Sequence, residues 1–288
     1  MKHSLTSYVC KLLLFTLPVI GYYSGRTLYL LANDRYQTTL HGHEVYTSLR
    51  KSKQKTKARK LIIGDSTANQ LYNTETDTTS GIFTLACNQA IGVVGHYLML
   101  KNYLEAGNSP EDVYMIYSPL SFWDNLDQVY TYHYFLKPFY NRTYRALMSA
   151  TVEKQVSKLP LYYLCQTPFI LTSDWSPEMA PQERDYTFLS PISREYLAKI
   201  CRLCKEHGVR LHLISPFLSE HWHDTICQFD ISETEGEVFT SLIKHYLQDL
   251  RYLDDNLFSD HLHLKPHLLA HYRLEMDKRI MKETIHQY

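Results

Sequence analysis

From residue 60 onward, short apolar runs alternate with longer segments in which apolar residues recur at helical spacing. The apolar runs cover residues 60–64, 83–87, 113–118 and 209–215, with a shorter one at 251–253. The helical segments cover residues 94–105, 190–207, 233–250 and 266–285. Strands that alternate with helices usually pair in parallel, because each helix carries the chain back to the same end of the sheet. The sequence therefore predicts an α/β fold with a mainly parallel sheet that helices cover on both faces.

Residues 119–189 interrupt this alternation and are rich in tyrosine, phenylalanine and tryptophan. We interpret them as a helical or loop insertion near the strand ends, within a single domain that spans residues 60–288. Their aromatic side chains have two readings. They pack as a lid or as part of the core, or they contact a sugar, since aromatic faces stack on pyranose rings. The candidates for sugar contact are Trp123, Tyr130, Tyr132, Tyr134 and Trp175.

An uncharged, mostly apolar stretch at residues 12–25 follows Lys2 and Lys11. Its length lies between that of a signal-peptide core and that of a membrane-spanning helix. The helix can continue to residue 32 if Arg26 snorkels. No clear small-x-small cleavage site follows, so we expect residues 1–32 to be an uncleaved membrane anchor rather than a cleaved signal or a buried helix. The preceding lysines favour a cytoplasmic N-terminus and a body on the exported side, periplasmic or extracellular.

The formal net charge of zero, from 30 basic and 30 acidic residues, conceals a split along the chain. Seven of the eleven residues at 50–60 are basic, whereas the chain from Leu61 onward holds 19 basic and 28 acidic residues. We expect residues 33–59 to form a basic linker that is either solvated or lies on anionic lipid headgroups. A zero total and an acidic body are not typical of nucleic-acid-binding proteins. We therefore expect membrane lipid, and not nucleic acid, as a partner.

Cysteine and histidine form no clear disulfide or metal pattern. Cys201 and Cys204 make a CxxC inside a predicted helix, but no second pair at zinc spacing accompanies them. Three histidines near the C-terminus are spaced by four residues, yet Pro266 starts the predicted helix after the first of them. A further histidine pair flanks Trp222. We expect packing cysteines, no bound metal and no cofactor.

Three turns of the predicted sheet carry residues with catalytic chemistry. Ser66 belongs to a Gly64-Asp65-Ser66 block at the end of the first strand, where a serine caps a helix or acts as a nucleophile beside free helical N–H groups. Asp260 precedes His263 by three residues on a loop, so its carboxylate can orient the imidazole, which then takes a proton from the serine. Residues Asn88 to Gly92 follow the second strand and form either an ordinary turn or part of an oxyanion hole.

The order of these three turns resembles that of the SGNH/GDSL-like hydrolases, in which a Gly-Asp-Ser block follows the first strand and an Asp-x-x-His block lies near the C-terminus. The resemblance covers about residues 60–288 and implies a three-layer α/β/α sandwich. It also implies that Ser66 is the nucleophile, His263 the general base and Asp260 its orienting partner. Gly92 matches the glycine of the family's second block, so that Ser66, Gly92 and Asn88 would form the oxyanion hole.

The third block departs from the family pattern. That block usually reads Gly-x-Asn-Asp, and its Asn completes the oxyanion hole, whereas residues 117–120 here read Tyr-Ser-Pro-Leu. Asn125 can substitute only if its loop folds back, and we take Asn125 and Trp123 as candidate substrate contacts. A similar departure occurs in membrane-anchored relatives that act on cell-envelope polysaccharides. We therefore expect a serine esterase or acyltransferase that acts on O-acetyl esters of a glycan. The alternative is a non-catalytic glycan-binding or assembly protein with the same fold.

Overall fold

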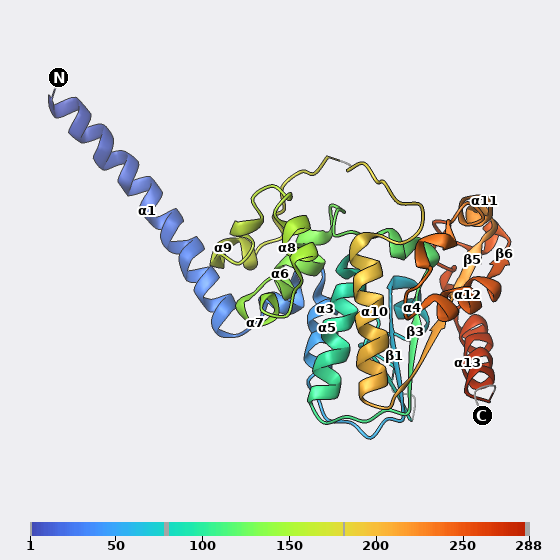
Figure 1. Cartoon of the computed structure of the whole chain (residues 1–288). Coiled ribbons are helices and arrows are strands. Elements are labelled where there is room, and N and C mark those ends of the chain that lie inside the picture. The colour runs from blue at the N-terminus through green and yellow to red at the C-terminus, as the bar shows by residue number, and fades with distance from the viewer. Residues whose placement is uncertain (1, 78–80, 181, 286–288) are drawn as a thin grey trace.

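A four-stranded sheet forms the centre of the computed structural model, which describes residues 2–77, 81–180 and 182–285 (Figure 1). The strands are β1 (Lys60–Gly64), β2 (Ile82–Thr84), β3 (Asp112–Ile116) and β4 (Arg210–Ile214). Their order is β2-β1-β3-β4, and every neighbouring pair is parallel. The prediction of an α/β fold with a mainly parallel sheet is confirmed.

The fifth predicted strand forms, but it lies outside this sheet. β6 (Arg251–Leu253) pairs in parallel with β5 (Phe217–Ser219) to make a separate two-stranded sheet. β5 follows β4 after Ser215 and Pro216, and a proline lacks the N–H group that would extend the β4 ladder. The chain therefore leaves the central sheet at this point, and β6 pairs with the departing segment.

The body of the protein contains five longer helices and several short ones among the described residues. The longer helices are α3 (His43–Lys51), α5 (Gly92–Glu105), α10 (Pro191–Glu206), α12 (Thr240–Gln248) and α13 (Leu269–Ile285). The short helices and turns outside residues 119–189 are α2 (Tyr36–Thr39), α4 (Ser66–Leu71), η1 (Gln89–Ile91), η5 (Glu220–Trp222), α11 (His223–Ile226), η6 (Ile231–Thr234), η7 (Asp255–Leu257) and η8 (Pro266–Leu268). The helix predicted at 233–250 is shorter than expected, because Gly236 takes a left-handed φ of 79° and the helix begins only at Thr240.

Helices pack on both faces of the central sheet, because alternate residues of a strand point to opposite sides. Leu61 and Ile63 of β1 belong to a large buried cluster with residues of α5 and α10. Ile62, between them, belongs to a second cluster with residues of α4 and α13. Figure 1 shows α5 and α10 running side by side on one side of β1 and β3, with α13 on the other side of these strands. Each face of the sheet thus has its own apolar core.

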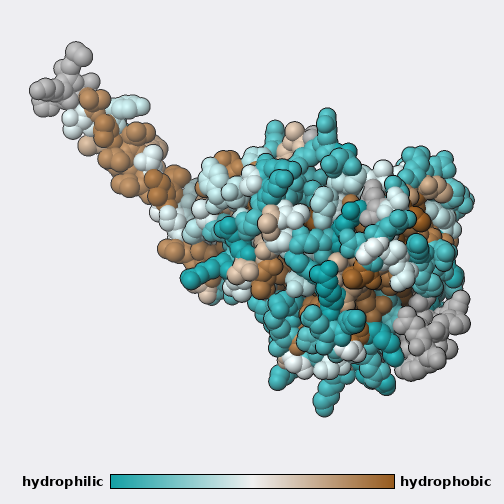
Figure 2. All heavy atoms as spheres, viewed as in Figure 1, coloured by the Kyte–Doolittle hydropathy of each residue, from teal (hydrophilic) through white to brown (hydrophobic). Residues whose placement is uncertain are grey.

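The N-terminal helix α1 (Lys2–Ala32) projects from the body (Figure 1). Its segment Leu5–Ala32 is long and apolar enough to cross a membrane. Figure 2 shows this helix covered by apolar residues, in contrast to the largely hydrophilic face of the body in the same view. Its C-terminal half contacts the body: the Tyr23 ring lies 6.5 Å from the Phe169 ring. Leu30 and Leu31 pack against a small buried cluster that includes Tyr36 and Tyr46. These features fit the expected membrane anchor.

Residues 33–59, expected to be a basic linker, are not an extended spacer in the structure. They form α2 and α3, and Val45 and Leu49 of α3 are buried in the large core cluster. The spacing of four residues places these two side chains on one face of the helix. Lys51 also donates a hydrogen bond of 2.6 Å to the Thr74 carbonyl. An apolar helical stripe inside the basic segment therefore holds the C-terminal end of α1 close to the body.

The aromatic insertion at residues 119–189 folds into short helices that contribute to the core. These are η2 (Pro119–Trp123), η3 (Tyr132–Leu136, a π-helical turn), α6 (Lys137–Phe139), α7 (Arg142–Arg145), α8 (Ala150–Val156), η4 (Tyr162–Leu164) and α9 (Pro168–Leu171). Buried aromatic side chains from this segment include Phe122, Tyr132, Phe135, Phe139, Tyr140 and Tyr144. Tyr132 is therefore a core residue, and the partly buried Tyr134 packs against the same cluster. Tyr130 and Trp175 are exposed.

Candidate active site

Ser66, His263 and Asp260 lie in direct contact at the carboxyl end of β1. Ser66 is the first residue of α4, and its Oγ lies 2.9 Å from Nε2 of His263. The other ring nitrogen, Nδ1, lies 2.8 Å from Oδ2 of Asp260. Residues 197 positions apart in the chain are thus joined in the arrangement of a serine–histidine–aspartate triad.

The Asp260 carboxylate determines which nitrogen of His263 carries the proton. Burial by itself would raise the pKa of Asp260, but hydrogen bonds from the ring and backbone of His263 and from the Leu262 N–H hold it below its usual value. An ionised carboxylate accepts the Nδ1–H of the imidazole, which leaves Nε2 as an acceptor facing Ser66. This is the tautomer that a general base needs.

The loop that carries Asp260 and His263 is held against α4 by Gln70. The Gln70 amide donates a 2.6 Å hydrogen bond to the Leu264 carbonyl and accepts one of 3.0 Å from the Leu264 N–H. An antiparallel bridge between Phe258 and Leu264 closes the base of the loop. Gln70 and Ser66 share one short helix, so the same helix positions both Ser66 and the loop of His263. Nothing in the local sequence marks Gln70 for this role, because its partner lies 194 residues away.

Asp65 fixes the turn between β1 and α4. Its side chain is fully buried and accepts hydrogen bonds from Thr67 N, Thr67 Oγ1 and Ala68 N, which cap the helix. It also accepts from the N–H of Ser118, at 2.7 Å, and from the hydroxyl of Ser121, at 2.6 Å. These last two residues follow β3, so one carboxylate joins the nucleophile turn to the loop after the neighbouring strand.

The candidate oxyanion loop follows β2 and lies next to the nucleophile turn. The Cys87 N–H donates to the Gly64 carbonyl at 3.0 Å, and the buried ring of His96 spans the carbonyls of Gly64, at 2.7 Å, and Gly92, at 3.0 Å. Burial lowers the pKa of His96, although both carbonyls favour its protonated form. Asn88 instead caps η1, with its side-chain oxygen accepting from the Ala90 N–H at 2.9 Å.

Trp123 and Asn125, the candidate substrate contacts, face other parts of the chain than Ser66. The Trp123 indole donates to the Thr187 carbonyl at 2.7 Å. Asn125 lines a polar cavity of about 480 Å³ together with Asp127 and Gln182. Among the described residues, no hydrogen bond links either side chain to Ser66. Their predicted contact with a substrate at Ser66 therefore stays a prediction.

Asp124 is buried against the candidate oxyanion loop and titrates abnormally. A Cβ atom added to Gly92 would lie 3.3 Å from Asp124 Oδ2, an atom without a hydrogen-bond partner. Burial, with a smaller contribution from Asp127, raises the pKa of Asp124 to about 8, while Arg184 and the Leu126 N–H act in the opposite sense. Native Asp124 therefore keeps a proton that the unfolded chain releases near its ordinary pKa of 3.8.

The Asp124→Asn variant is expected to flatten the pH dependence of stability. Because the native state of the wild type binds the extra proton, its free energy of unfolding falls as pH rises from about 4 to about 8. Asparagine keeps an acceptor for the Leu126 N–H, at 3.0 Å in the wild type, but binds no proton. Thermal melts at about pH 5 and about pH 8 should show a smaller drop in Tm for the variant. Equal drops in the two proteins would contradict this assignment.

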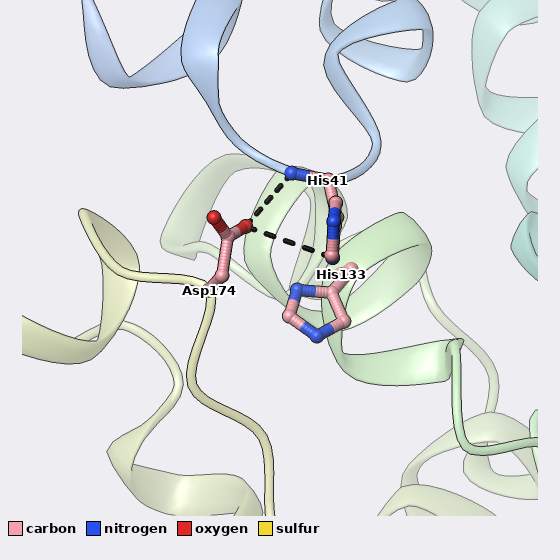
Figure 3. A group of neighbouring side chains, drawn as sticks. All are labelled: His41, His133 and Asp174. Carbon is pink, nitrogen blue, oxygen red and sulfur yellow. Dashed lines mark hydrogen bonds and ion pairs between the residues drawn. The ribbon is translucent and has the colours of Figure 1, made fainter.

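Two groups of described residues bring metal-ligand atoms within 4.8 Å of one another. Figure 3 shows the first, in which Asp174 accepts a hydrogen bond from the His41 backbone at 2.8 Å and faces the His41 ring, with His133 beside them. The Lys137 ammonium already lies 3.5 Å from His133 Nδ1 and donates to the Trp175 carbonyl at 3.0 Å. A lysine cation thus competes with a metal here. The second group comprises His221, Asp255 and His261.

The six cysteines are free thiols, and Cys201 and Cys204 lie within α10. Cys204 is buried, and its pKa is raised to about 12, mainly by that burial. Cys204 therefore has the role of a packing residue in the core. The side chain of Cys201 is partly buried against the main core cluster.

Comparison with known proteins yields no family model that matches the chain and no curated protein that matches it. The resemblance to SGNH-like hydrolases therefore depends on the three sequence blocks and on the contacts between their residues.

Proposed function

We propose that the chain is a membrane-anchored serine esterase or acyltransferase whose residues 60–288 form an SGNH-like three-layer α/β/α domain. One observation carries this proposal: His263 contacts Ser66 Oγ through Nε2, at 2.9 Å, and Asp260 through Nδ1, at 2.8 Å. The proposed substrates are O-acetyl esters of a cell-envelope glycan. This class follows from the family resemblance and from α1, which would hold the body on the exported side of a membrane.

The proposed reaction proceeds through an acyl-enzyme. Nε2 of His263 takes the proton from Ser66 as the Oγ attacks the ester carbonyl, and Asp260 stabilises the imidazolium that forms. The imidazolium then protonates the departing alcohol oxygen, which leaves the acyl group on Ser66. Attack by water on this ester completes an esterase cycle, and attack by a sugar hydroxyl completes a transferase cycle. In both cases His263 removes the proton of the attacking hydroxyl.

The backbone N–H groups of Ser66 and Gly92, with the Asn88 side chain nearby, are the proposed donors to the oxyanion. The Gly92 N–H donates to the Gln89 carbonyl in this structure, so it must leave that carbonyl to bind an oxyanion. His96 supports the proposed oxyanion hole because its ring lies between the two turns. Its Nδ1 is 3.0 Å from the Gly92 carbonyl, and its Nε2 is 2.7 Å from the Gly64 carbonyl. The family's third donor has no counterpart in residues 117–120. Loss of one such donor costs about 3–4 kcal/mol of transition-state stabilisation in a serine hydrolase. We therefore expect slow turnover of simple esters.

A non-catalytic glycan-binding or assembly protein is the second candidate. The loop after β3 favours it, because the Ser118 N–H is already engaged by Asp65 and is not free to bind an oxyanion. The hydrogen-bonding distance between Ser66 and His263 favours the enzyme, since a binding protein has no need for a base beside a serine hydroxyl.

Labelling by a fluorophosphonate probe distinguishes these two candidates. The probe phosphonylates a serine only when a neighbouring base activates the hydroxyl, so we expect the wild type to be labelled and Ser66→Ala to remain unlabelled. Ser259→Ala is a matched control, because Ser259 is exposed on the loop of Asp260, and it should be labelled like the wild type. Absence of labelling in the folded wild type would favour the binding protein.

A further inference from the structure

Three side chains with metal-ligand atoms surround the outer side of the loop that carries Asp260 and His263. His221 lies in η5, Asp255 begins η7, and His261 lies between the two triad residues. Their ligand atoms lie within 4.8 Å of one another, and all three residues are exposed. Three separate segments thus bring two imidazoles and one carboxylate to one place, immediately beside the proposed base.

Hydrogen bonds made by side chains hold these three segments together without using the imidazole nitrogens. Asp255 Oδ1 accepts a 2.8 Å hydrogen bond from the His221 N–H and another from the Ser219 hydroxyl. The Trp222 indole donates to the His261 carbonyl at 3.0 Å. No hydrogen bond to the ring nitrogens of His221 or His261 is present among the described residues. The positions of the rings are therefore set by the backbone, while their lone pairs stay available.

The two imidazoles lie closer than two independent surface histidines would. Their ring centroids are 4.3 Å apart and their planes are inclined by 24°. His261 reaches this position with a left-handed φ of 60°, a conformation that costs a non-glycine residue about 1 kcal/mol or more. The local contacts thus maintain a strained backbone that keeps the His261 ring against His221.

The ligand types suit zinc. Zn²⁺ binds His nitrogen and carboxylate oxygen in tetrahedral sites, and two such ligands lie about 3.4 Å apart at Zn–N distances near 2.1 Å. Exposed side chains within 4.8 Å reach this spacing when the two rings rotate about their side-chain torsions, which also turns the lone pairs from the near-stacked arrangement toward one ion. Asp255 makes no ion pair with lysine or arginine in the described part of the chain, in contrast to the group near Lys137.

We propose that His221, His261 and Asp255 bind one divalent transition-metal ion, with Zn²⁺ the best match, and that this ion braces the loop of Asp260 and His263. The fourth position is open to water. Bound metal would join η5 and η7 to the catalytic loop at a point one residue from Asp260. Metal binding itself does not depend on the proposed esterase activity, so the two can fail separately.

The test is a titration of the metal-free full-length protein in detergent with Zn²⁺, followed by calorimetry, and with Co²⁺, followed by absorption. We expect one site whose affinity falls about 100-fold or more in His221→Ala, since changes outside the ligand set alone cost 10–100-fold. This variant keeps the backbone N–H that donates to Asp255, so its Tm without metal should match that of the wild type. His261→Gln, which keeps the length of a polar side chain, should weaken binding equally.

His41→Ala is the matched control, because it changes the other histidine–aspartate group and should leave the affinity unchanged. Unaltered Zn²⁺ binding in both His221→Ala and His261→Gln would overturn the proposal, as would absence of binding by the wild type. A thiolate-to-cobalt charge-transfer band would also overturn it, since Cys227 lies 3.8 Å from His223 and would then be a ligand. Fluorophosphonate labelling in the same samples reports the state of Ser66 independently.

Discussion

Ser66→Ala is expected to lower kcat/KM for a simple acetyl ester by about 10⁴-fold or more while the protein remains folded. The hydroxyl supplies the nucleophile, and its only described hydrogen-bonding partner is His263, at 2.9 Å. Its loss leaves the N-cap of α4 intact, because that role belongs to Asp65. Turnover of p-nitrophenyl acetate and the Tm should be measured on the same samples. Undiminished turnover by the variant would exclude Ser66 as the nucleophile.

His263→Ala is the companion experiment, and its effect should not add to that of Ser66→Ala. Two residues that act as one unit cause nearly the full loss when either is removed. The double variant should therefore retain about the same residual rate as each single variant. Ser259→Ala, on the same loop, should turn over like the wild type. Independent, multiplying losses would mean that Ser66 and His263 do not act in one step.

The strands and the triad could be predicted from the sequence because both depend on local pattern and on one general rule. Short apolar runs such as residues 60–64 and 113–118 indicate buried strands, and parallel strands end at one edge of the sheet. A serine after the first strand and an Asp-x-x-His block before the last helix are then expected at the same edge. The structure brings Ser66 and His263 to hydrogen-bonding distance there.

The supporting residues could not be predicted, because their roles depend on partners that are remote in the chain. Gln70 acts on Leu264, and His96 spans Gly64 and Gly92, yet neither pattern differs from that of an ordinary helix residue. The same limit applies to residues 33–59, where the run of charges conceals the apolar stripe of α3. Composition reports the average of a segment, whereas burial depends on which face of the helix carries each residue.

The N-cap of α4 shows that a sequence motif can be recognised before the structural role of each of its residues is known. The Gly-Asp-Ser block points to the serine, but the buried residue is Asp65, whose carboxylate accepts five hydrogen bonds, three from the first turn of α4 and two from residues that follow β3. Three of the donors are backbone N–H groups, on Thr67, Ala68 and Ser118. A hydrophobic side chain at position 65 would leave all three buried without a partner.

Asp65→Ala is therefore expected to destabilise the protein by roughly 3–6 kcal/mol, since each buried donor left without a partner costs about 1–3 kcal/mol. Denaturant unfolding followed by circular dichroism measures this loss. Asp254→Ala is the matched control: Asp254 also caps a short helical turn, with its carboxylate accepting from the Asn256 N–H at 2.9 Å, but it is exposed. Its replacement should cost about 1 kcal/mol or less.

The same variant should also impair catalysis in whatever fraction remains folded. Asp65 is the only described side chain that joins the Ser66 turn to the loop after β3, so its removal frees Ser66 to move relative to His263. Because a displacement of about 1 Å in a reacting group costs about 100-fold in rate, turnover per folded molecule should fall together with stability. Turnover per folded molecule equal to that of the wild type, despite the lost stability, would show that Gln70 alone keeps Ser66 and His263 in register.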